Sequence, residues 1–113
     1  PIQETKSIYG EYLSHYGFEM LGQTGAGRTV SDQSMQPPDA ALQLGRKLKA
    51  EFPDADTLYF PSPHWSTMDA VEAIEQELGI NAVTATSAIL WSAMRLSGIA
   101  DRLKDYGRLM REF

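Results

Sequence analysis

Ser62 and His64 are the two side chains of this sequence best suited to chemistry. They stand in the segment Phe60-Pro-Ser-Pro-His-Trp65, directly after an apolar run that is typical of a strand. In an α/β sheet, ligands bind at the loop that follows the carboxyl end of a strand. We therefore take Ser62 and His64 as candidate catalytic residues, and Pro63 between them as a candidate substrate contact.

The spacing of this pair does not favour a hydrolase. A serine hydrolase brings its histidine base from a distant loop, whereas Ser62 and His64 are two positions apart. Two interpretations of His64 remain open: an acid or base in a site, or a loop histidine that hydrogen-bonds to the backbone and orders the turn between two prolines. Trp65 is more typical of a packing residue than of a stacking surface for a substrate.

A second group of polar side chains, Thr84, Thr86 and Ser87, follows the next predicted strand. Hydroxyls and free backbone N–H groups near a helix N-terminus make an anion site, so a substrate carboxylate could bind there. The alternative is that these hydroxyls only cap the helix.

Alternating helices and strands have to position these groups. The patterning predicts helices over residues 2–16, 38–52, 66–79 and 88–98 and strands over residues 18–21, 57–60 and 80–83. This alternation, with right-handed crossovers, predicts a single flavodoxin-like α/β domain over residues 1–113, a parallel sheet with helices on both faces. Ser66 and Asp69 resemble a capping box at the start of the third helix. Residues 22–36 form a polar loop long enough to be functional.

The last segment, residues 99–113, keeps apolar residues at helical spacing although no strand follows it. We expect a tail helix whose apolar stripe packs on this domain, on another lobe or on a partner.

Composition excludes several classes of function. The net charge of −5 argues against a nucleic-acid surface, which needs clustered positive charge. The absence of cysteine removes disulfides, thiolate metal sites and thiol catalysis from within these 113 residues, and we expect neither a metal nor a cofactor. No apolar run approaches the roughly 20 residues that span a bilayer, and no signal peptide is visible, so the cytoplasm is the expected location.

The second half of the chain resembles the aspartate/glutamate racemase superfamily, in its maleate isomerase and arylmalonate decarboxylase branch. The motifs that carry the likeness are Ser62-Pro-His-Trp-Ser-Thr67-Met-Asp69-Ala, Glu77-Leu-Gly-Ile-Asn-Ala-Val83, Trp91 with Arg95-Leu-Ser-Gly98, and Tyr106-Gly-Arg-Leu109. The resemblance implies a fold of two similar lobes with the active site between them, so this chain looks like the C-terminal lobe alone. The N-terminal lobe would then be its partner.

The resemblance also implies the chemistry. In this family each lobe can offer a cysteine at the end of a strand, which acts on a substrate bearing carboxylates. Here Ser62 stands where the second-lobe thiol belongs, which counts against two-base racemisation and against decarboxylation of the arylmalonate type. Isomerisation with a first-lobe nucleophile, or a decarboxylase or lyase in which His64 donates the proton, remains.

Three hypotheses follow from this reading. The first is a cofactor-independent enzyme acting on a small mono- or dicarboxylic acid, with Ser62 and His64 in the site and Thr84, Thr86 and Ser87 as substrate contacts. The second is a catalytically impaired ligand-binding or structural member of the same family. The third is an unrelated α/β domain that forms a homo-oligomer through its tail.

Overall fold

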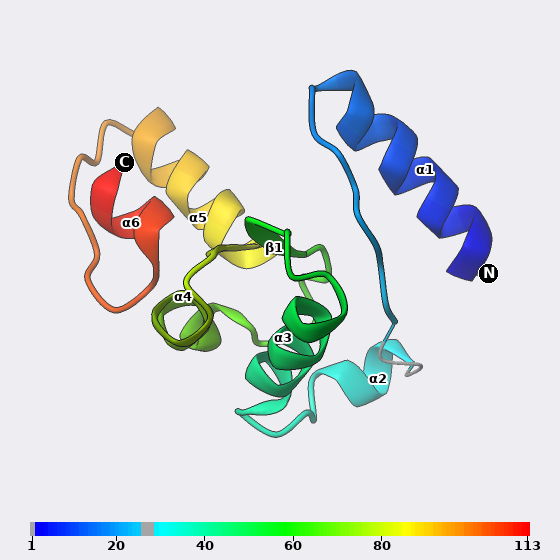
Figure 1. The fold of residues 1–113 in the computed structure, drawn as a ribbon. Helices are drawn as coiled ribbons and strands as arrows, with labels where there is room; N and C mark the ends of the chain where they lie inside the picture. Colours follow the sequence, from blue (N-terminus) through cyan, green and yellow to red (C-terminus); the bar gives the residue numbers. More distant parts are fainter. Residues whose placement is uncertain (1, 26–28) are drawn as a thin grey trace.

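The computed structural model describes residues 2–25 and 29–113, and for residues 2–7 it describes the backbone only. The elements are α1 (Ile2–His15), α2 (Val30–Gln33), α3 (Ala40–Glu51), β1 (Thr57–Phe60), the 3-10 helix η1 (Met68–Ala70), α4 (Val71–Leu78), β2 (Asn81–Thr84), α5 (Ala85–Leu96) and α6 (Arg108–Glu112). Figure 1 shows α3 to α6 gathered around the strands and α1 to one side, joined by an extended segment.

The two strands pair in parallel, with Leu58 opposite Ala82 and Phe60 opposite Thr84. A parallel pair needs a crossover connection, and here η1 and α4 supply it. The predicted α/β class and the parallel pairing are therefore confirmed.

The core forms on one face of the strands, where Leu58, Phe60 and Ala82 are buried and Ile74 of α4 is completely enclosed. Tyr59, which points to the other face, is 49% exposed. The other members of this core are Ala41, Trp65, Ala70, Val71 and Ile80. The burial of Val71 and Ile74 on α4, and the end of that helix at Gly79 with a φ of 64°, agree with the sequence prediction.

The predicted strand over residues 18–21 is wrong. These residues are extended but belong to no sheet in the described structure, because β1 pairs only with β2. The predicted loop over residues 22–36 contains the short helix α2, since Thr29 caps it by accepting from the Asp32 N–H at 3.4 Å. Residues 26–28 of that loop lie outside the described residues.

Two predicted helix starts are also wrong. Ser66 and Asp69 form no capping box: the helix begins as η1 after Thr67, whose side chain makes no capping hydrogen bond. The capping box lies instead at Thr84 and Ser87, so α5 begins at Ala85 and no loop separates it from β2.

The helix in the tail spans only Arg108–Glu112, not residues 99–113. Arg95 holds the preceding segment in a non-helical course, because its Nη1 donates to the carbonyls of Ile99 and Asp101 at 2.8 and 3.2 Å. A left-handed Gly107, with a φ of 90°, then leads into α6.

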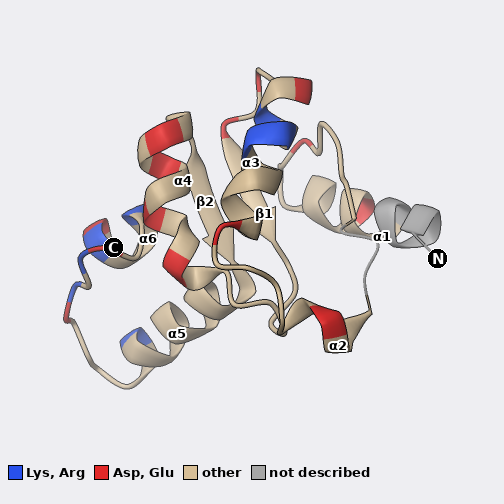
Figure 2. Ribbon diagram, turned by 90° about the horizontal axis from the view of Figure 1, so that it is seen from below, with Lys and Arg blue, Asp and Glu red and all other residues tan. Residues whose placement is uncertain are grey.

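Two carboxylates of α4 bind the start of α6. Glu72 accepts from the Gly107 N–H at 2.9 Å, and Glu75 accepts from the Arg108 N–H at 2.7 Å. These bonds satisfy N–H groups that a helix start leaves without an intrahelical partner. Figure 2 shows the acidic residues along α4 beside the basic α6. The second carboxylate oxygen of Glu75 accepts from the Ala82 N–H at 3.1 Å, so the same residue also binds β2.

We predict that Gly107→Ala destabilises the domain strongly. A Cβ at this position would clash with Cγ1 of Val71, in addition to the strain of a backbone with positive φ. The two effects together should lower the free energy of unfolding by about 3 kcal/mol in urea titrations. Gly98→Ala is the control for the clash: its φ of 76° is also positive but no atom lies within 4 Å, so about 1 kcal/mol is expected. Equal losses in the two variants would contradict the predicted clash.

We further predict that Glu72 contributes to the acid sensitivity of the fold. The pKa of Glu72 is lowered, chiefly by the Gly107 N–H and then by Gln76 and Arg111. A lowered carboxyl pKa adds stability above the unfolded-state pKa, and that stability is lost as the pH falls through the folded-state pKa. Between pH 5 and pH 3, about the range of carboxyl titration, the wild-type protein should therefore lose more stability in urea than Glu72→Gln. Glu51→Gln, at an exposed position on α3, should leave the wild-type pH profile unchanged.

Candidate functional site

The register of the two strands brings both groups of candidate residues to one edge of the sheet. Phe60 and Thr84 are partners at the carboxyl ends of β1 and β2. The loop with Ser62, Pro63 and His64 begins directly after Phe60, and α5 begins directly after Thr84. This edge is the candidate site.

The loop after β1 is held by its aromatic residue. Trp65 is buried and packs edge-to-face on Phe60, with ring centroids 5.9 Å apart and an interplanar angle of 85°. This confirms Trp65 as a packing residue. Because Phe60 and Trp65 are both anchored in the core, the four residues between them must bulge from the sheet edge, and His64 and Pro63 are exposed while Ser62 is half-buried.

Ser62 makes one side-chain hydrogen bond. Its hydroxyl donates to Oε1 of Gln33 at 2.5 Å, which joins the β1 loop to α2. The His64 ring makes no hydrogen bond with the described residues, so the backbone bonds of the loop-ordering interpretation are not seen among them. Its side chain is open to solvent beside Ser62.

Thr84 and Ser87 are fully buried and bind each other reciprocally. The Ser87 N–H donates to Thr84 Oγ1 and the Thr84 N–H donates to Ser87 Oγ, both at 3.0 Å. The Ser87 hydroxyl also lies 3.1 Å from the Thr84 carbonyl oxygen, to which it donates. Their hydroxyls therefore define the start of α5, while Thr86 between them is exposed. Substrate binding by the three residues stays a prediction.

The sequence reasoning missed two residues near this edge. Gln33 was not identified because its contact with Ser62 joins positions 29 residues apart. Thr67 is 1% exposed, and its Oγ1 atom has no hydrogen-bond partner among the described residues. No sequence signal marks Gln33; the adjacent hydroxyl residues Ser66 and Thr67 could have pointed to Thr67.

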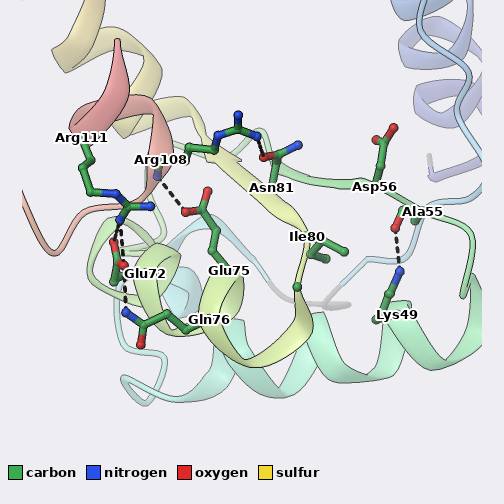
Figure 3. A pocket seen from close by; sticks show the side chains of 11 residues that line it. Lys49, Ala55, Asp56, Glu72, Glu75, Gln76, Ile80, Asn81, Arg108 and Arg111 are labelled. Carbon is green, nitrogen blue, oxygen red and sulfur yellow. Dashed lines mark hydrogen bonds and ion pairs between the residues drawn. The ribbon is translucent and has the colours of Figure 1, made fainter.

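A separate hollow of about 550 Å³ lies at the opposite, amino edge of the sheet. Asp56, which precedes β1, and Asn81, the first residue of β2, line it. Its cationic groups are engaged within the protein: Arg111 Nη1 lies 2.9 Å from Glu72, and Lys49 donates to the Ala55 carbonyl at 2.8 Å (Figure 3). We therefore assign this hollow to the packing of α6 and not to ligand binding.

In residues 8–25 and 29–113, whose side chains the structure describes, no group of three or more His, Asp or Glu side chains is arranged to hold a metal ion. None of the helices described is both long and apolar enough to cross a membrane.

Comparison with known proteins identifies arylmalonate decarboxylases as relatives. A family model described as arylmalonate decarboxylase matches residues 3–110. The arylmalonate decarboxylase of Bordetella bronchiseptica is 30% identical over 105 residues, which are 90% of this chain and 41% of that protein. The family model also covers residues 3–55, which contain none of the motifs that suggested the resemblance.

Solved structures agree in fold. A crystal structure of arylmalonate decarboxylase superposes with a TM-score of 0.81 at 25% identity, over 89% of this chain and 45% of that one. A liganded double mutant of the enzyme, with one glycine-to-cysteine and one cysteine-to-serine substitution, gives a TM-score of 0.88 at 24% identity over 98% of this chain and 48% of that one. The chain thus spans less than half the length of these relatives.

The predicted resemblance is confirmed by the family model, the curated relative and the shared fold together. Because the family model accounts for nearly the whole sequence, the chain belongs to the arylmalonate decarboxylase family.

Proposed function

We propose that residues 1–113 form one lobe of a cofactor-independent enzyme that decarboxylates or isomerises a small mono- or dicarboxylic acid. Family membership supports the reaction class. The observation that carries the location is the register of Phe60 with Thr84, which puts the Ser62 loop and the start of α5 at the same sheet edge.

The start of α5 is suited to a carboxylate. The first N–H groups of a helix lack intrahelical partners, and the helix dipole adds positive potential there. The capping box uses the N–H groups of Thr84 and Ser87. Those of Ala85 and Thr86, in the same first turn, remain for a ligand oxygen.

His64 is the proton donor in this proposal. In decarboxylation the bond to one carboxyl carbon breaks, carbon dioxide leaves, and the electron pair stays on the α-carbon, where it is delocalised into the remaining acyl group. A proton must then reach that carbon. An imidazolium can supply it near neutral pH, whereas a serine hydroxyl is too weak an acid to do so alone. Ser62 therefore holds the substrate and His64 supplies the proton.

The second wall of the site comes from polypeptide outside residues 1–113 in this proposal. The relatives are more than twice as long as the matched region. Apolar side chains at the end of α5 and in the tail are also exposed, with Leu96 at 87% and Phe113 at 61%. Such residues suit packing on a second lobe, in line with the expected role of residues 99–113.

Serine in place of a thiol is compatible with ligand binding in a relative. The solved double mutant carries a cysteine-to-serine substitution and is in a liganded form. This supports a site in which Ser62 still binds substrate. The alternative, a family member that only binds ligand, differs from the proposal in turnover and not in affinity.

The experiment that tests the proposal uses the complete protein that contains this chain. A panel of small mono- and dicarboxylic acids, phenylmalonate and maleate included, is examined for turnover and for thermal shift. We predict that His64→Ala lowers kcat at least about tenfold, as expected for loss of a general acid. His15→Ala, an exposed histidine on α1, is the control and should retain full activity. Unchanged kcat in His64→Ala rules out the proton-donor role, and binding of an acid without turnover favours the ligand-binding alternative.

A second prediction concerns Ser62. If it occupies the position of the family thiol, Ser62→Cys should raise the rate of phenylmalonate decarboxylation at least about tenfold, because a thiol can give up a proton near neutral pH and a hydroxyl cannot. Ser66→Cys places a thiol at an exposed position of the same loop and should have no effect. Equal rates in the wild type and Ser62→Cys would show that position 62 does not reach the reacting carbon.

A further inference from the structure

Among the described residues before α3, Gln33 has a side chain that hydrogen-bonds to the candidate catalytic residue Ser62. Its Oε1 atom accepts from the Ser62 hydroxyl at 2.5 Å, and both residues are half-buried. α2 is ordered locally: Thr29 caps it, and Gln36 Nε2 donates to the Asp32 carbonyl at 3.0 Å. The amide is thus presented to Ser62 by a short, capped helix.

The direction of this hydrogen bond limits what Ser62 can do. A serine hydroxyl has one proton to donate. Since that proton is directed to Gln33, the hydroxyl of Ser62 offers only its lone pairs to a ligand. A carboxylate is itself an acceptor when ionised, so Ser62 in this arrangement cannot hold it without help.

Gln33 has the missing donors. A glutamine side chain carries an acceptor oxygen and an NH₂ group with two donors. While Oε1 is engaged with Ser62, Nε2 makes no hydrogen bond to the described residues. The geometry therefore puts two N–H donors, without a partner among the described residues, beside Ser62 and at the same sheet edge as the start of α5.

We propose that Gln33 is a substrate-positioning residue: its Oε1 atom fixes the Ser62 hydroxyl and its Nε2 group donates to a carboxylate of the substrate. This inference rests on the proposed function, and it names a third contact that recognises the acid. In this proposal α2, which lies between α1 and α3 in the chain, forms one wall of the site in addition to the loops at the strand ends.

Kinetics of the complete protein separate this role from a structural one. Gln33→Glu keeps an acceptor for Ser62 but replaces the donors with a negative charge that repels the substrate. We expect KM for the acid substrate, or Kd from thermal-shift titration with phenylmalonate, to rise at least about tenfold in both Gln33→Glu and Gln33→Ala. kcat should change less than KM. Gln43→Ala, at an exposed position on α3, is the control. Wild-type KM and Kd in Gln33→Glu would overturn the proposal.

A labelling experiment tests the contact without any activity. The chain has no cysteine, so Ser62→Cys makes a single thiol in residues 1–113. Adding Gln33→Ala should speed its alkylation by iodoacetamide several-fold, because the amide no longer covers position 62. Adding Gln43→Ala should not. If the two double variants react equally, Gln33 does not cover position 62 and the proposal fails.

Turnover tests the proposed function, whereas Kd tests the positioning role of Gln33, so the two can fail separately. If the wild type binds phenylmalonate without turning it over, the proposed reaction fails, whereas a weakened Kd in Gln33→Glu still supports the positioning role.

Discussion

The parallel pairing of β1 with β2 is the constraint on which the rest of the structure depends. It makes Phe60 and Thr84 partners, and so the two segments that leave the sheet after them begin side by side. A parallel pair needs a crossover, and α4 fills that role with Ile74 wholly buried under the strands. This pairing is what places Ser62 and the start of α5 at the same edge of the sheet.

The two edges of the sheet are built differently. At the amino edge, Glu72 and Glu75 bind backbone N–H groups of the tail and of β2, and Arg111 pairs with Glu72. At the carboxyl edge, Thr84 and Ser87 bond to each other and Ser62 donates to Gln33, but His64 is exposed and its ring has no hydrogen-bond partner among the described residues. The polar groups that surround the hollow at the amino edge are engaged by the fold, so we assign that hollow to packing.

A serine at position 62 changes what its neighbours must do. A thiol can exchange a proton near neutral pH, but a hydroxyl needs other groups to supply both the proton and the charge recognition. The chain places an imidazole two residues away and an amide in direct contact. In the proposed function, these three side chains would share the work of one thiol: His64 would supply the proton, and Ser62 and Gln33 would contact the substrate.

Local signals in the sequence predicted β1, α4, β2 and the loop that carries Ser62, although not the start of η1 or the short helix in the tail. Three local signals agree with the structure. They are the apolar periodicity of α4, its C-terminal cap at Gly79 and the strand that precedes Ser62. The sequence-based prediction was wrong where an element depends on a partner far away in the chain. Residues 18–21 have a strand-like composition, yet a strand exists only through its neighbour, and none pairs with them in the described structure.

Only the tertiary structure decided how the polar groups are used. The capping box at Thr84 and Ser87, in place of Ser66 and Asp69, follows from the abrupt junction of β2 with α5. The contact between Gln33 and Ser62 joins positions 29 residues apart, and no local pattern encodes such a distance. The sequence could therefore locate the loop of Ser62 and His64, because the end of a strand is marked by neighbouring residues in the chain. Its bonding partners required the fold, because hydrogen bonds between distant segments depend on how the helices pack.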